Sequence, residues 1–175
     1  MAWVAGADVT TGDLITAAQW NNYLGATGSL EHLGTPELWV PASSWYDNSG
    51  AVWSAPTWDA AELKEADDRA YMYFKVPDIF ASLAEAVIVV RPLATQAAAD
   101  WDIYANYGAT GENYIIHTES DLATTYNVTN NQFFEVNASG ILTALAAGDH
   151  VQLILINKNS AHDVGVFGFF MRYNA

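Results

Sequence analysis

Few side chains in this sequence have the types and spacing that catalysis requires. The four histidines, His32, His117, His150 and His162, are far apart, none has a metal-binding spacing, and there is no cysteine. The chain also lacks the nucleophile motif of serine hydrolases and any glycine-rich phosphate or dinucleotide motif. We therefore expect no enzymatic activity, no cofactor and no metal site. A glycosidase with two carboxylates stays open as an alternative, because the pairing of carboxylates depends on the fold.

A group of aromatic residues is the better candidate for a binding site. Trp45, Tyr46, Trp53 and Trp58 lie close together in a stretch rich in Ser, Asp and Asn. Aromatic rings beside polar side chains are what a sugar-binding platform requires. The alternative, which we favour, is that these rings close one end of the fold or pack between subunits.

The charge balance excludes other classes of partner. Twenty acidic residues against six basic ones give a formal net charge of −14, and the basic residues are scattered. No basic stripe could follow a phosphate backbone, so we expect no nucleic-acid binding. No apolar run is long enough to span a bilayer, so we expect no membrane insertion. The first residues also lack the basic start and apolar core of a signal peptide.

Short apolar or alternating runs separated by turn residues are typical of β-strands. Roughly eight to ten of them, with a turn every eight to twelve residues or so, predict an all-β antiparallel β-sandwich of jelly-roll type. We assign residues 34–175 to this domain. A tight hairpin is expected at Asn130 and Asn131. The clearest expected strands are Glu37–Pro41, Tyr71–Val76, Ala86–Arg91, Trp101–Asn106, Asn113–His117, Thr125–Thr129, Gln132–Val136, Val151–Ile156 and Val164–Tyr173.

The last two of these strands carry apolar residues on both faces if their alternation is regular. A strand that is apolar on both faces needs cover on both faces. Because few helices are expected, we predict that another subunit supplies the second layer. The residues expected at this subunit interface are Val166, Phe167, Phe169, Phe170 and Met171.

Residues 1–33 are expected to form a separate segment with one short helix. Thr16 can cap the helix, Gln19 completes a capping box, and Gly25 can end it. A helix of about nine residues is marginal in water and must pack on something. That support is either the β-domain of the same chain or, as we favour, a different protein. The expected contact residues are Leu14, Ile15, Thr16, Trp20, Asn21 and Leu24.

Trp3 and the segment from Thr11 to Asn21, TGDLITAAQWN, resemble the opening of many structural proteins of tailed bacteriophages. Such proteins are described as tail fibres, head fibres or minor virion proteins, and the segment holds an outer domain on the particle. The resemblance covers about the first 25 residues. It implies a virion protein assembled in the bacterial cytoplasm and held by another virion protein through residues 1–28. Whether it lies on the head or the tail stays open.

The pattern from Leu145 to Leu153, L-x-x-G-D-x-V-x-L, followed by Val166–Phe170, is similar to the tumour-necrosis-factor and complement-head superfamily. The similarity implies a jelly roll whose units form homotrimers about their terminal strands. Together the two resemblances predict a non-enzymatic virion protein that displays a trimeric β-domain as capsid decoration or fibre. The alternative function is host attachment, as the receptor- or glycan-binding tip of a phage fibre.

Overall fold

The computed structural model describes residues 35–46 and 61–175. The chain divides after Gly34, and the second unit runs from Thr35 to Ala175. Several predictions fall outside the described residues: the N-terminal helix, its six contact residues from Leu14 to Leu24, and the platform residues Trp53 and Trp58.

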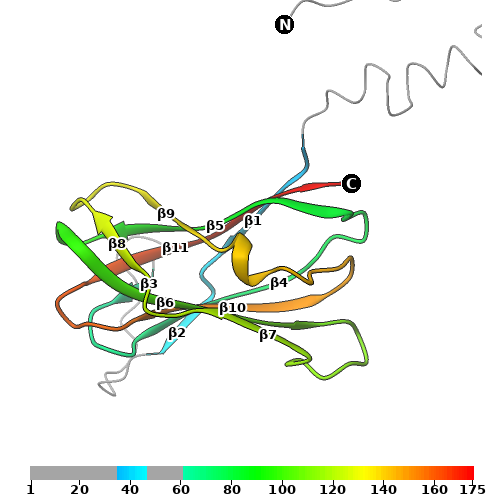
Figure 1. Ribbon diagram of the computed structural model, residues 1–175, viewed down its shortest axis with the longest axis horizontal. Helices are drawn as coiled ribbons and strands as arrows, with labels where there is room; N and C mark the ends of the chain where they lie inside the picture. The colour runs from blue at the N-terminus through cyan, green and yellow to red at the C-terminus, as the bar shows by residue number, and fades with distance from the viewer. Residues whose placement is uncertain (1–34, 47–60) are drawn as a thin grey trace, which may run out of the picture. The chain divides into compact units, whose positions relative to one another are not determined.

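The described residues form two antiparallel sheets that pack against each other (Figure 1). Sheet A has the order β1 (Glu37–Pro41), β11 (Val164–Asn174), β5 (Ser82–Pro92) and β9 (Phe134–Asn137), with β3 (Ala61–Leu63) also paired to β11. Sheet B has the order β2 (Ser44–Tyr46), β4 (Arg69–Lys75), β10 (His150–Asn157), β6 (Gln96–Gly108) and β7 (His117–Asp121), with β8 (Thr125–Val128) also paired to β6. The predicted all-β antiparallel sandwich is confirmed.

The core between the sheets comes from alternate residues of the central strands. Phe74 of sheet B stacks on Phe169 of sheet A with ring centroids 4.9 Å apart. A buried side chain of this size contributes about 1.5–3 kcal/mol, so this layer fixes one sheet against the other. Other fully buried side chains of the core include Met72, Ile88, Trp101, Ile103, Leu153, Leu155 and Met171.

Within the described ranges, no helix is long and apolar enough to cross a membrane.

Strand β11 differs from the expectation because it contains a β-bulge. Val166 lies opposite Val90 of β5, but Gly168 lies opposite Val89, so Phe167 is an extra residue. The extra residue reverses the alternation that the sequence suggested.

The bulge corrects the expected subunit interface. Val166, Phe169 and Met171 all point into the core of the single chain and are 0% exposed. The second sheet of the same chain covers them, so they have no surface to offer another subunit. Only Phe167 and Phe170 keep part of their surface exposed.

Two other local predictions were wrong. Asn131 does turn the chain, with φ of 60°, but the flanking strands do not pair with each other. Strand β8 pairs with β6 in sheet B and β9 pairs with β5 in sheet A, so the turn carries the chain between sheets. The strand expected at Asn113–His117 begins only at His117, because residues 109–116 fold into a loop.

Candidate functional site

The outer side of sheet B carries tyrosines on neighbouring strands. Tyr71 and Tyr73 of β4 lie on this side, with ring centroids 6.1 Å apart and ring planes within 5° of parallel. Tyr104 of β6 lies two strands away from Tyr71, with Ile154 of β10 directly between them in register. Because neighbouring strands are about 4.8 Å apart, the backbones of these two tyrosines are roughly 10 Å apart. We call the surface formed by Tyr71, Tyr73, Tyr104, Asn106, Thr118, Gln152 and Ile154 face B.

A line of hydrogen-bonded polar side chains crosses four strands of face B. Gln152 Nε2 donates to the Tyr73 hydroxyl at 2.9 Å, and Asn106 Nδ2 donates to Gln152 Oε1 at 3.2 Å. Thr118 Oγ1 donates to Asn106 Oδ1 at 3.0 Å. These bonds hold each side chain in place, yet the tyrosine hydroxyl proton and one N–H of each amide are left for a ligand.

Ile154 forms an apolar floor between the tyrosines. It points outward on β10 but is only 9% exposed. Tyr71 and Tyr104 lie directly opposite it on the two neighbouring strands, and their longer side chains shield it. The outward apolar residue that suggested a second subunit over β10 is therefore covered within the chain.

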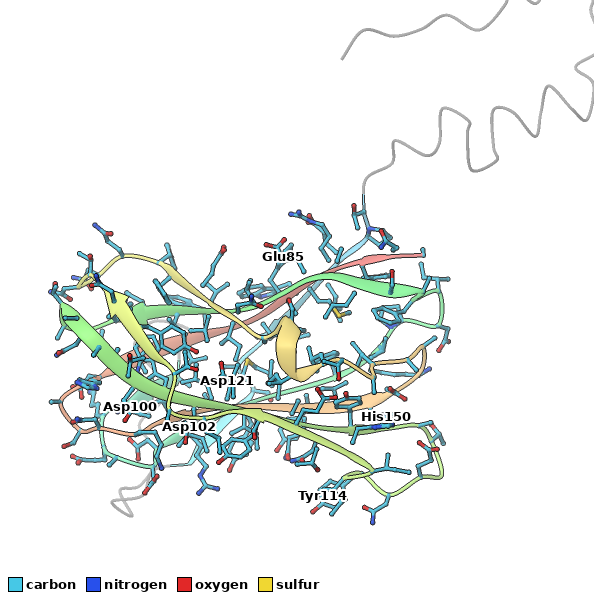
Figure 2. The ribbon with its side chains drawn as sticks, in the orientation of Figure 1. Glu85, Asp100, Asp102, Tyr114, Asp121 and His150 are labelled. Atoms are coloured by element: carbon cyan, nitrogen blue, oxygen red, sulfur yellow. The ribbon has the colours of Figure 1, made fainter. Side chains whose placement is uncertain are left out.

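A loop of residues 109–116 forms a raised rim at one side of face B. A Cβ atom at Gly108 would lie 2.8 Å from Ile116 Cγ2 and 3.0 Å from the Asn113 carbonyl oxygen. The loop therefore folds back onto β6 at a position that only glycine leaves free. Tyr114, at 70% exposure, lies on the outer side of sheet B (Figure 2).

Two contacts tie this loop to the strands. Thr118 Oγ1, at the end of the polar line, lies 3.3 Å from the Ile115 carbonyl oxygen, which is a second acceptor for the same hydroxyl proton. Thr110 Oγ1 lies 3.1 Å from Nε2 of His150 at the start of β10. Because the first contact ends on Thr118 of face B, the position of the rim is coupled to the position of the polar line.

On the inner side of sheet B, the buried Tyr107 of β6 is hydrogen-bonded to the partly exposed Glu119 of β7. The Tyr107 hydroxyl donates to Glu119 Oε1, and Thr143 Oγ1 donates to Glu119 Oε2 at 2.8 Å. Burial and the bond to Glu119 raise the pKa of Tyr107 to about 12. Burial alone would raise the pKa of Glu119, but the bonds from Tyr107 and Thr143 outweigh it and leave that pKa below its usual value. At neutral pH a neutral phenol thus binds a charged carboxylate, which fixes β7 beside β6.

Half of the aromatic platform predicted from the sequence joins the same sheet. In the edge strand β2, Trp45 lies opposite Ala70 and Tyr46 lies opposite Arg69 of β4. Tyr71, Tyr73 and Tyr104 were not predicted as site residues, although their alternation with buried residues was the available signal in the sequence. Within residues 35–46 and 61–175, no three His, Cys, Asp or Glu side chains gather in a group that could hold a metal ion.

Comparison with known proteins gives only a distant likeness. No family model matches the sequence, and no curated protein matches it. One similar solved structure is the CBM36-1 domain of a multidomain xylanase from the hindgut metagenome of Trinervitermes trinervoides, with a TM-score of 0.43 and 11% identity over 80% of this chain and 99% of that one.

Two further solved structures have lower TM-scores. TmCBM61 in complex with β-1,4-galactotriose has a TM-score of 0.36 and 12% identity, over 88% of this chain and 99% of that one. CsCBM6-3 from Clostridium stercorarium in complex with cellobiose has a TM-score of 0.32 and 15% identity, over 77% and 95%. At such low TM-scores and identities, what this chain binds has to be argued from its own residues.

Proposed function

We propose that this chain is a glycan-binding β-sandwich and that face B is its binding surface. The observation that carries the proposal is the set of Tyr71, Tyr73 and Tyr104 on neighbouring strands beside a line of polar side chains already held in place. A sugar ring has faces of C–H groups, which pack on aromatic rings, and a rim of hydroxyl groups, which need donors and acceptors. Face B offers both on rigid strands, so little conformational entropy is lost on binding.

The expected ligand is an uncharged oligosaccharide or polysaccharide. The polar line of face B consists of two amides and two hydroxyl groups, which pair with sugar hydroxyls without requiring a charge. A formal charge of −14 on the whole chain repels polyuronates and sulfated glycans. The open arrangement across four strands suits an extended chain of several sugar units.

Other parts of the sequence-based prediction remain proposals beside this one. Consecutive strands alternate between the two sheets from β1 to β6 and again from β8 to β11, while β6, β7 and β8 all belong to sheet B, and this alternation supports a jelly roll. A place in a bacteriophage particle rests on the N-terminal motif, which lies outside the described residues. A glycan-binding domain held on a particle would serve host attachment, and we propose no enzymatic activity.

The test measures binding of the full chain to neutral polysaccharides, with a polyuronate as the charged counterpart. Affinity gel electrophoresis should show retardation by at least one neutral polymer and none by the polyuronate. Titration calorimetry with a short oligosaccharide of that polymer then gives the affinity of a single surface.

Matched variants assign the binding to face B. Tyr73→Ala should weaken oligosaccharide binding about tenfold, which corresponds to about 1.4 kcal/mol. Trp39→Ala, on the outer side of sheet A, removes an aromatic ring that is equally exposed, at 50%, and should leave the affinity unchanged. No retardation by any neutral polymer, or equal losses in the two variants, would overturn the proposal.

A further inference from the structure

The outer side of sheet A carries an apolar surface that the proposed glycan site does not use. Trp39 of β1, Phe170 of β11 and Val87 of β5 are direct cross-strand neighbours in one row. In the next row the bulge at Phe167 brings its ring to 5.2 Å, centroid to centroid, from the ring of Phe133. We call the surface formed by Trp39, Val87, Val89, Phe133, Phe167 and Phe170 face A.

Face A is exposed in the single chain. Trp39 is 50% exposed and Phe133 is 74% exposed, while Phe167, Phe170 and Val89 are partly exposed. The indole of Trp39 lies close to β11 at Gly168, since a Cβ atom there would be only 3.1 Å from Trp39 Cζ2. A contiguous aromatic and aliphatic surface of this kind on a soluble protein marks a place where another molecule binds.

The basic residues at the margins of face A are already paired within the chain, whereas the exposed Glu135 of β9, directly opposite Val89, has no ion pair among the described residues. Arg172 lies 3.4 Å from Glu37 and 3.3 Å from Glu85, and its guanidinium lies over the Phe170 ring. At the other end, Arg91 lies 3.8 Å from Glu62. Figure 2 shows Glu85 on this outer side of the sandwich, opposite the side of Tyr114.

This pattern favours one kind of partner. A polar ligand such as a sugar would find a single hydrogen-bonding group among the six side chains of face A, the indole N–H of Trp39. An acidic partner recognised by charge would need unpaired basic side chains, whereas Arg172 and Arg91 are neutralised locally. An apolar surface whose arginines are neutralised within the chain complements another surface of the same composition.

We propose that face A is the surface through which a second copy of this chain binds. The chain carries a formal charge of −14, so two copies repel each other over most approaches. Face A is where they can approach with their arginines paired and exclude water from aromatic rings. The trimer predicted from the sequence is one form this association can take, with Phe167 and Phe170 kept from the predicted interface and Trp39 and Phe133 added.

The test is the mass of the full chain in solution, measured by light scattering during size-exclusion chromatography over a range of concentrations. The expected result is a multiple of the 19.0 kDa subunit mass. The oligomer should persist in high salt, because apolar contacts are not screened. A mass of 19.0 kDa at every concentration would overturn the proposal, whichever other molecule or segment covers face A.

Two matched pairs of variants assign the interface. Trp39→Glu should weaken association about 30-fold or more, while Tyr73→Glu, with the same 50% exposure on face B, should leave the mass unchanged. Phe133→Glu, at 74% exposure, should act like Trp39→Glu, while Tyr114→Glu, at 70%, should not.

Circular dichroism checks that each variant is folded. If Trp39→Glu does not fold, the effect of Phe133→Glu on the mass decides whether face A is the interface. An oligomer that all the folded variants retain equally would place the interface elsewhere and contradict the proposal. Because these measurements involve no glycan, their outcome is independent of the function proposed for face B.

Discussion

Face A presents tryptophan, phenylalanine and valine, whereas face B presents tyrosine, asparagine, glutamine and threonine. Both lie on the outer sides of sheets in one sandwich, and both use the residues that alternate with the core. The difference lies in the atoms at the ends of the side chains. Rings without polar atoms gain most when water is excluded, while tyrosines and amides can exchange water for another polar ligand. Face A is therefore suited to an interface that excludes water, and face B is suited to a hydrated polar ligand.

If both proposals hold, the two faces act together. Association through face A leaves a copy of face B on every subunit. A polysaccharide long enough to reach two copies then binds the second at a high effective concentration, which strengthens binding without any new contact. This explains why a weak site on a single sandwich could be sufficient for attachment.

Replacing two glycines tests the roles of the two faces separately, because one glycine lies under each face. Gly168, under face A, should have the larger effect on stability. A Cβ atom there would lie 2.3 Å from the Val40 carbonyl oxygen and 2.9 Å from Pro41 Cα. Both are backbone atoms, so Gly168→Ala must push β1 away from β11. We expect a loss of about 3 kcal/mol or more in the free energy of unfolding, measured by urea denaturation. Trp39 would be displaced with β1, so association should weaken as well.

The control for this change is Gly140→Ala, because a Cβ atom at Gly140 has no neighbour within 4 Å. That variant should keep the stability of the original chain. Equal stability of the two variants would mean that β1 is not seated closely on β11, and the position of Trp39 on face A would then be in doubt.

Gly108 is the corresponding position on face B, and its replacement should have a smaller effect. One of its two close neighbours, Ile116 Cγ2, is the end of a flexible side chain. Gly108→Ala should therefore cost about 1–2 kcal/mol in stability, by shifting the loop 109–116 away from β6. Glycan affinity, measured by calorimetry, should fall, while the mass of the oligomer stays unchanged. A loss of oligomer with full glycan affinity would reverse the roles of the two faces.

The sequence allowed the sandwich and most strands to be predicted, because their alternation or continuous apolar character is local. Tyr71 and Tyr73 alternate with Met72 and Phe74, so an outward tyrosine pair was already implied. The polar neighbours of that pair could not be predicted. Gln152 is 79 residues from Tyr73 in the sequence, and only the register of β10 and β4 brings them together. Register is set by packing across the whole sheet and leaves no local pattern.

Face A was partly predicted, and the error has a definite cause. Phe167 and Phe170 were both predicted, but regular alternation along β11 placed Phe167 on one face with Phe169 and Met171, and Phe170 on the opposite face with Val166. One bulged residue moves Phe169 and Met171 into the core and leaves Phe167 outside. Bulges depend on the partner strand, so the apolar run alone could not locate this one.

The smallest expected effect concerns Glu119, which supports face B from the inner side of sheet B. Its pKa is below the usual value of 4.5 in the folded chain, owing to the bonds from Tyr107 and Thr143. A lowered pKa means that the charged carboxylate stabilises the fold above about pH 4.5, and that this contribution is lost as the pH falls through the folded-state pKa.

Glu119→Gln keeps the shape of the side chain and an acceptor for the Tyr107 hydroxyl but removes the charge. At pH 7 the variant should be less stable by about 1 kcal/mol, since the bonds from Tyr107 and Thr143 are no longer charge-assisted. Thermal unfolding followed from pH 7 down to pH 3 should show the two proteins converging once the carboxylate of the original chain is protonated. A difference that stays constant over this range would show that the charge of Glu119 is not what holds β7. Association through face A should be unaffected at pH 7, because Glu119 lies in the other sheet and its loss acts on Thr118 and the polar line of face B.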